Sequence, residues 1–157
     1  MQPARFAYDL THCAIGRAHD LIGEKWTLLI VREAFYGVRR FDDFARALGC
    51  GRGVLSDRLK TLTRAQVLER RDYVRRGQRP RAEYHLTEKG RDLFPALTAL
   101  SQWSERWDPP PEGPVALITE RGAGRPVEAI LTSDPYAQRL TLQDIEISPG
   151  PGARRVE

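Results

Sequence analysis

Residues 52–64 read RGVLSDRLKTLTR, and two partly apolar segments follow them, VLERRDYV at 67–74 and AEYHL at 82–86. Leucines recur in the first segment at intervals of four and three residues, which predicts a helix with one side in a core. The later segments predict short strands, because the helical period is lost there. Residues 75–81, between the strands, are polar and contain Gly and Pro, so a loop is expected.

Further helices are expected on both sides of this stretch. Three precede it, each closed by a glycine: 13–22 before Gly23, 26–34 before Gly37, and 41–48 before Gly49. Another begins at a Thr87 cap and carries apolar residues as far as Trp107, with a kink near Pro95. Short helices followed by a β-hairpin with a basic tip are the element order of a winged helix-turn-helix. The expected fold class is therefore α+β and mainly α.

Positive charge is concentrated in the middle of the chain. Residues 46–81 contain eleven Lys and Arg against three Asp and Glu, a balance of +8, whereas the whole chain carries +4. Such a cluster is typical of proteins that bind nucleic-acid phosphates, although a solvated basic surface would have the same composition. Double-stranded DNA is the expected partner.

The helix that begins near Arg52 is the candidate DNA-reading element, because a helix in the major groove reads bases with its N-terminal residues. Arg52 is suited to a bidentate contact with guanine, and Ser56 to a base or a phosphate. Gly53 would let the backbone approach DNA. Phosphates are the expected partners of the other cations of the helix, Arg58, Lys60 and Arg64. The loop would form the wing, whose arginines suit phosphates or a narrow minor groove: Arg75, Arg76, Arg79 and Arg81. The alternative is that these arginines only keep a hairpin soluble.

Several segments together resemble one family. They are HCAI at 12–15, LIGEKWTLLI at 21–30, RRFDDF at 39–44, VLSDRLK at 54–60 and EYHLTEKG at 83–90. In this order they resemble the HxlR-type winged helix-turn-helix regulators over residues 12–107. The resemblance implies a bacterial-type repressor or activator that binds a two-fold-related operator as a homodimer.

Three positions depart from the family pattern. Gly51 stands in place of the usual serine cap, so the helix near Arg52 is expected to start less firmly. Cys50 occupies an aliphatic position, which favours a packing role. Gln66 replaces the glycine that usually ends the helix, so we expect a distorted turn there.

The resemblance also implies which helices form the dimer. In the family, the first and last helices of the domain make the subunit contact, which here would use Ile15 and the residues Leu97, Leu100, Trp103 and Trp107. The apolar stripe of the last helix independently favours a partner, since so small a domain offers little else to cover two tryptophans. The alternative is that the tryptophans pack on the C-terminal segment.

Cys13 is the candidate redox sensor. Some members of the family use a cysteine at this place as a redox switch, and a helix N-terminus lowers the pKa of a thiol. His12 and Arg17 would add to this effect if they lie close. An oxidant or a small molecule is thus the candidate effector, and an unreactive thiol packed in the dimer contact is the alternative.

Residues 109–157 are expected to form a small β-rich extension to a DNA-binding and dimerisation domain at 1–108. They contain three apolar segments that predict short strands, 115–119, 127–132 and 140–147. Longer relatives often carry a tail resembling a zinc ribbon, but this chain has no cysteine after Cys50. We therefore expect a degenerate ribbon without metal ligands, and neither a metal nor a cofactor.

Other classes of protein fit the sequence less well. An enzyme is not expected, because the sequence contains no phosphate-binding glycine loop, no metal-ligand pair and no spacing typical of a nucleophile with its base. The apolar runs are only a few residues long, which predicts a cytoplasmic protein without a membrane partner. The remaining alternative is a winged helix that contacts only proteins and binds no specific DNA sequence.

Overall fold

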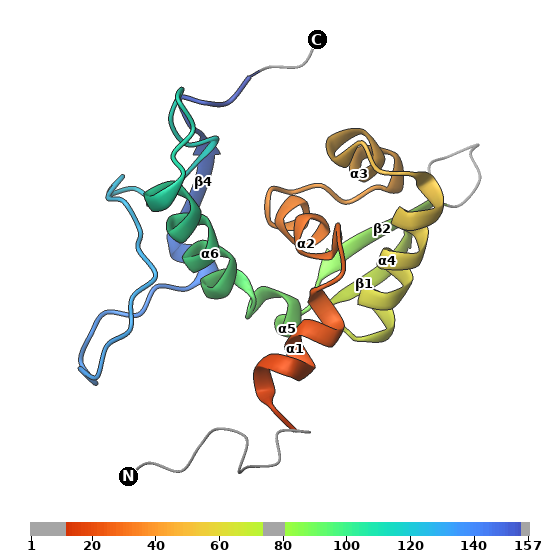
Figure 1. Ribbon diagram of the computed structural model, residues 1–157, viewed down its shortest axis with the longest axis horizontal. Helices are drawn as coiled ribbons and strands as arrows, with labels where there is room; N and C mark the ends of the chain where they lie inside the picture. Colours follow the sequence, from red (N-terminus) through yellow and green to blue (C-terminus); the bar gives the residue numbers. More distant parts are fainter. Residues whose placement is uncertain (1–11, 74–80, 155–157) are drawn as a thin grey trace. The chain divides into compact units, whose positions relative to one another are not determined.

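The computed structural model describes residues 12–73 and 81–154. The chain divides into two compact units, residues 1–90 and residues 91–157 (Figure 1). The packing boundary thus places the last long helix in the same unit as the C-terminal segment. The sequence placed its boundary after residue 108 instead, because it divided the chain into a DNA-binding and dimerisation part and an extension. The roles of the two parts stay a prediction.

The first unit is built around helices that bury their apolar sides against one another. They are α1 (Ala14–Ile22), α2 (Thr27–Phe35), α3 (Phe41–Leu48) and α4 (Arg52–Arg64). Phe44 of α3 and the three leucines of α4 are fully buried with Ile30 of α2, and each such side chain contributes about 1.5–3 kcal/mol. The helices predicted before residue 65 are confirmed, and the leucines determine which side of α4 faces outward.

A hairpin completes the fold of this unit. Strands β1 (Leu68–Tyr73) and β2 (Arg81–Leu86) pair antiparallel along their whole length, and α4 packs on β1 (Figure 1). The connection between α2 and α3 joins the hairpin through an isolated bridge between Arg40 and Glu83. The expected α+β winged helix-turn-helix is confirmed.

The turn between α4 and β1, where Gln66 replaces the glycine of the family pattern, has a left-handed backbone at that residue. Gln66 has φ of 58°, in the left-handed region that favours glycine. Thr87 Oγ1 donates to the Gln66 carbonyl oxygen at 2.6 Å and accepts from the Gly90 amide at 3.1 Å. A Cβ on Gly90 would lie 2.1 Å from the Val67 carbonyl oxygen, so only glycine fits there.

The single kinked helix expected after Thr87 was wrong, because two helices occupy this part of the chain. The short α5 (Glu88–Arg91) is capped by Thr87, as expected, and α6 (Phe94–Trp107) begins after a two-residue turn. Pro95 lies in the first turn of α6, where no intrahelical hydrogen bond needs its missing N–H. Proline therefore starts a helix here and does not bend one.

The second unit consists of α6 and a two-stranded sheet. Strands β3 (Ala116–Glu120) and β4 (Ile145–Pro149) pair antiparallel, and a 3-10 turn, η2 (Leu142–Asp144), precedes β4. The strand expected at 127–132 was wrong. Gln102 of α6 binds this segment instead: its Nε2 donates to the Val127 carbonyl oxygen and its Oε1 accepts from the Ala129 amide, each at 2.9 Å.

Candidate nucleic-acid interface

The side of α4 opposite its buried leucines is polar. Gly53, Asp57, Lys60 and Arg64 are exposed on this side, and Ser56 lies beside them, half-buried. Asp57 and Lys60 form an ion pair of 3.7 Å across one helical turn, which in water restrains them weakly. This outward side therefore offers both donors and acceptors that fit base edges and phosphates.

A recess of about 370 Å³ lies between this side of α4 and the hairpin. Its lining residues are Lys60, Thr63, Arg64, Arg70 and Tyr84. Three of them are cations and none is an acid, although Arg70 also pairs with Asp72 on its own strand at 2.9 Å. Converging cations raise the local concentration of anions, so the recess favours a phosphate group.

Arg52, the candidate base-reading residue, is held at the start of α4 by two residues of α3. Its Nη1 donates to Asp42 Oδ1 at 2.9 Å, and its Cζ lies 4.7 Å from the centroid of the Phe41 ring. The side chains of Arg52 and Asp42 are nevertheless 70% and 68% exposed. An ion pair this exposed restrains Arg52 only weakly by itself, and the Phe41 ring adds a second contact while the guanidinium group stays accessible.

Arg58 lies on the opposite flank of α4 and has a protein partner. Its Nη2 donates to Glu24 Oε2 at 2.8 Å, and its side chain is about three-quarters covered. Glu24 belongs to the connection between α1 and α2. The structure therefore does not bring Arg58 together with Lys60 on the outward side.

Of the four expected wing residues, the structure describes one. Arg75, Arg76 and Arg79 lie outside the described residues, and Arg81 is the exposed first residue of β2. Arg81 lines a second recess, of about 520 Å³, with the cations Arg40, Arg46 and Arg52 and the acids Asp42 and Asp43. Arg40 and Arg46 were not predicted as contacts, because only the folded chain brings them beside Arg52.

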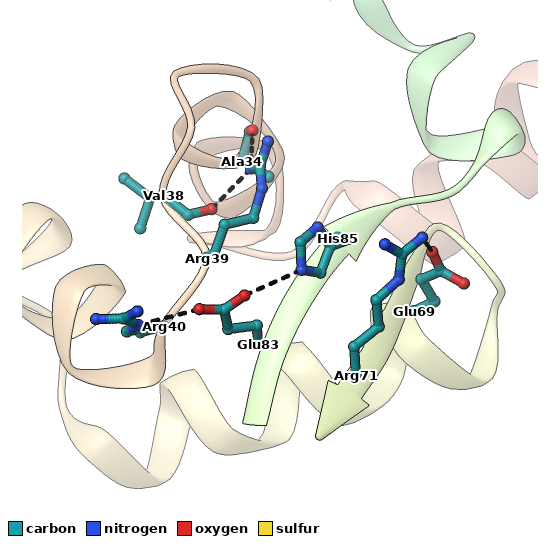
Figure 2. A network of polar contacts seen from close by, with 8 residues as sticks. All are labelled: Ala34, Val38, Arg39, Arg40, Glu69, Arg71, Glu83 and His85. Atoms are coloured by element: carbon teal, nitrogen blue, oxygen red, sulfur yellow. Dashed lines mark hydrogen bonds and ion pairs between the residues drawn. The ribbon is translucent and has the colours of Figure 1, made fainter. Parts of the chain in front are cut away.

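A chain of polar contacts braces the hairpin against the connection between α2 and α3 (Figure 2). Arg40 Nε donates to Glu83 Oε1 at 3.1 Å, and Glu83 Oε2 lies 3.3 Å from His85 Nε2. The hydrogen bond from Arg40 holds the pKa of Glu83 below its usual value. Beside them, Arg39 donates to the Ala34 carbonyl oxygen, and burial lowers its pKa. The sequence signal for this brace was slight: an acid and a histidine alternate on one strand.

Cys13 lies immediately before α1. It is half-buried and forms no disulfide with another described residue. The Arg17 amide donates to the Cys13 carbonyl oxygen at 3.0 Å, and the Arg17 guanidinium donates to the His12 carbonyl oxygen. Arg17 and His12 are therefore near Cys13, and the cation of Arg17 already has a partner.

The two helices expected in a subunit contact both have exposed apolar side chains. All of α1 is exposed or half-buried, Ile15 included. On α6, Leu97 is half-buried, whereas Leu100, Trp103 and Trp107 are 51%, 65% and 71% exposed. These three lie on the side of α6 away from its buried residues Phe94 and Thr98. The C-terminal segment thus leaves both tryptophans largely uncovered within their own unit.

The comparison with protein families identifies the family of this chain. The family model described as HxlR-like helix-turn-helix matches residues 21–112, more than half of the chain. The chain belongs to this family. A relative of this HxlR-like protein is Rv3095 of Mycobacterium tuberculosis, named as an uncharacterized HTH-type transcriptional regulator. It is 42% identical over 148 residues, which cover 92% of each chain.

Solved structures resemble the HxlR-like chain over most of its length. The crystal structure of PA1607, a candidate transcription factor, has a TM-score of 0.70 and 34% identity, and covers 88% of this chain and 95% of its own. The reduced form of the transcriptional regulator YodB from Bacillus subtilis has a TM-score of 0.54 and 25% identity, with 61% and 93% covered. The protein is thus a transcription regulator of the HxlR-like winged-helix type. Across residues 12–73 and 81–154, no helix has both the length and the apolar character needed to cross a membrane.

Proposed function

We propose that this HxlR-like regulator binds a two-fold-related DNA operator as a homodimer, with α4 in the major groove and the hairpin along the adjacent backbone. The observation that carries the proposal is the recess of Lys60, Arg64 and Arg70 beside the polar side of α4. Phosphate contacts fix the register of a protein on a duplex, and base contacts select the sequence. The arrangement provides groups for both tasks side by side.

The roles follow from these positions. Arg52 and Ser56 read bases, and Gly53 lets the backbone of α4 approach them. Lys60 and Arg81 bind phosphates, as do the wing residues Arg75, Arg76 and Arg79. Arg58 binds a phosphate only if its ion pair with Glu24 opens, so it contributes less than Lys60.

Base reading and phosphate binding are separable by experiment. A DNA duplex that the purified protein enriches from a random library is titrated by fluorescence anisotropy at several salt concentrations, with a scrambled duplex as the control. Arg52→Ala is expected to lower affinity for the enriched duplex by about 1–3 kcal/mol and to relax base preference, whereas Arg76→Ala weakens both duplexes alike. A wild-type protein that enriches no sequence would contradict the proposal and favour a winged helix that contacts only proteins.

The homodimer is proposed to form through α1 and α6, with Ile15, Leu97, Leu100, Trp103 and Trp107 in the contact. Exposed aromatic side chains of this size are typical of subunit interfaces, where each can bury about 150–250 Å². Trp103→Ser is expected to shift the protein toward the monomer in sedimentation equilibrium. Tyr136→Ser is the matched control, because Tyr136 is also a largely exposed aromatic residue of the second unit. Equal behaviour of the two variants would exclude α6 from the contact.

Cys13 is proposed as the site of an oxidant response. YodB, a regulator of similar fold, has been solved in both a reduced and a diamide-treated form. In this dimer, the Cys13 thiols of the two subunits would lose two protons and two electrons to an oxidant such as diamide and form a disulfide, which would alter the spacing of the two α4 helices. Operator binding with and without diamide tests this in the wild type, in Cys13→Ser and in the control Cys50→Ser. Cys13→Ser alone should lose the response; a response that survives in it would refute the role.

A further inference from the structure

We infer that Asp42 and Phe41 of α3 are positioning residues that fix Arg52 for contact with a guanine, and so help to set the sequence preference. This inference rests on the proposed DNA-binding function. Its basis is that Arg52 is contacted at two different parts of its side chain. Asp42 accepts a hydrogen bond from Nη1 at 2.9 Å, and Arg52 Cζ lies over the Phe41 ring, 4.7 Å from its centroid.

These two contacts restrict the guanidinium in complementary ways. The carboxylate binds Nη1 and the ring lies beside Cζ, whereas Nε and Nη2 have no hydrogen-bond partner among the described residues and can still donate. Guanine presents two acceptors, O6 and N7, to a bidentate donor in the major groove. A free arginine side chain loses about 2 kcal/mol of rotamer entropy when it is fixed. Restraint before binding therefore reduces the entropic cost of the correct contact.

The charges around Arg52 explain why Asp42 affects specificity more than affinity. Arg40, Arg46 and Arg81 line the same recess, so an acid there weakens attraction to the phosphates of every duplex. The hydrogen bond to Arg52, by contrast, matters only where a guanine is read. Asp42 thus lowers affinity for all DNA slightly and raises discrimination between sequences.

The chain offers a matched control at the next position. Asp43 carries the same charge on the same helix, but its ion-pair partner is Arg46, at 3.5 Å, and not Arg52. Asp42→Asn and Asp43→Asn therefore change the net charge equally, and both side chains are solvent-accessible enough for the fold to tolerate the change. The two variants differ in whether they release Arg52.

The test measures affinity for the duplex enriched by the wild type and for a scrambled duplex, and takes their ratio. Both variants should bind the scrambled duplex slightly more tightly, because each has lost one negative charge that repels phosphates. Only Asp42→Asn should lower the ratio, by about threefold to tenfold, part of the discrimination that a bidentate contact provides. In an Arg52→Ala background, Asp42→Asn and Asp43→Asn should become indistinguishable.

Phe41→Leu keeps an apolar side chain but removes the aromatic ring. It should lower the ratio in the same direction, and its melting temperature is monitored to exclude unfolding.

The outcomes separate this inference from the function on which it rests. A wild-type protein that enriches no sequence overturns both. An enriched sequence with equal ratios for Asp42→Asn and Asp43→Asn overturns the positioning role alone. A higher ratio in Asp42→Asn than in Asp43→Asn also overturns it, because the ion pair would then hold Arg52 away from the base.

Discussion

Replacing Arg64 by glutamine removes one cation from the recess beside α4 and keeps a long polar side chain. Arg64 is exposed and its Nη2 lies 3.5 Å from Thr61 Oγ1, so the stability change should stay within about 0.5 kcal/mol. A dimer that places each Arg64 at a phosphate loses two contacts, and the slope of log affinity against log salt becomes less steep by about 1.8. Between 50 and 200 mM salt, this difference in slope amounts to about tenfold in affinity.

Fluorescence anisotropy with the enriched and the scrambled duplex, each at four salt concentrations, measures this slope. Arg139→Gln is the control, because it removes the same charge from an exposed position in the second unit. We expect the slope to change in Arg64→Gln for both duplexes and to stay constant in Arg139→Gln. An unchanged slope in Arg64→Gln, or a loss limited to the enriched duplex, would refute the assignment of Arg64 to a phosphate.

Three further predictions concern the scaffold that holds this surface, and denaturant unfolding measures each of them. Gln66→Gly should raise the free energy of unfolding by about 0.5–1 kcal/mol, because relief of the left-handed backbone exceeds the added entropy of the unfolded chain. Gly90→Ala should lower it by about 1–3 kcal/mol, since the new Cβ meets a carbonyl oxygen; a neutral result would mean that the chain shifts freely there. The pKa of Glu83 is lower in the folded than in the unfolded chain, so its ion pair with Arg40 stabilises the fold at neutral pH, and this contribution is lost as the pH falls below 4.5 and through the folded-state pKa. Glu83→Gln should therefore be less stable than the wild type at neutral pH and equal to it in strong acid; a constant difference would refute this.

The local pattern of the sequence was sufficient for most of the first unit. The leucine spacing in 52–64, the glycines after the earlier helices and the Thr87 cap act within a few residues of the chain, so each could be interpreted without the fold. The departure from the family pattern at Gln66 marked this turn as unusual, but its left-handed backbone was shown only by the structure. These features position α4 and the hairpin, which carry the candidate site.

What the sequence did not show depends on contacts between distant residues. Arg52 and Asp42 are ten positions apart, and Arg40 and Glu83 are forty-three apart, so neither pair has a spacing that identifies it. The segment at 127–132 has the composition of a strand, but a strand also needs a neighbour to pair with. Here the pairing with β3 ends at Pro126 and Val127, and a side chain of α6 binds Val127 and Ala129. Periodicity contains no information about such an arrangement.

That side chain, Gln102, limits how this part of the molecule can change during evolution. It must donate to the Val127 carbonyl oxygen and accept from the Ala129 amide at once, and glutamine is the only neutral residue of its length that does both. A glutamate, whether it arose by mutation or by slow deamidation with age, would set a carboxylate against the Val127 carbonyl oxygen and so lose the hydrogen bond that Gln102 donates. Ageing of the protein would then loosen the C-terminal segment, while the tryptophans on the other side of the same helix remained unaltered.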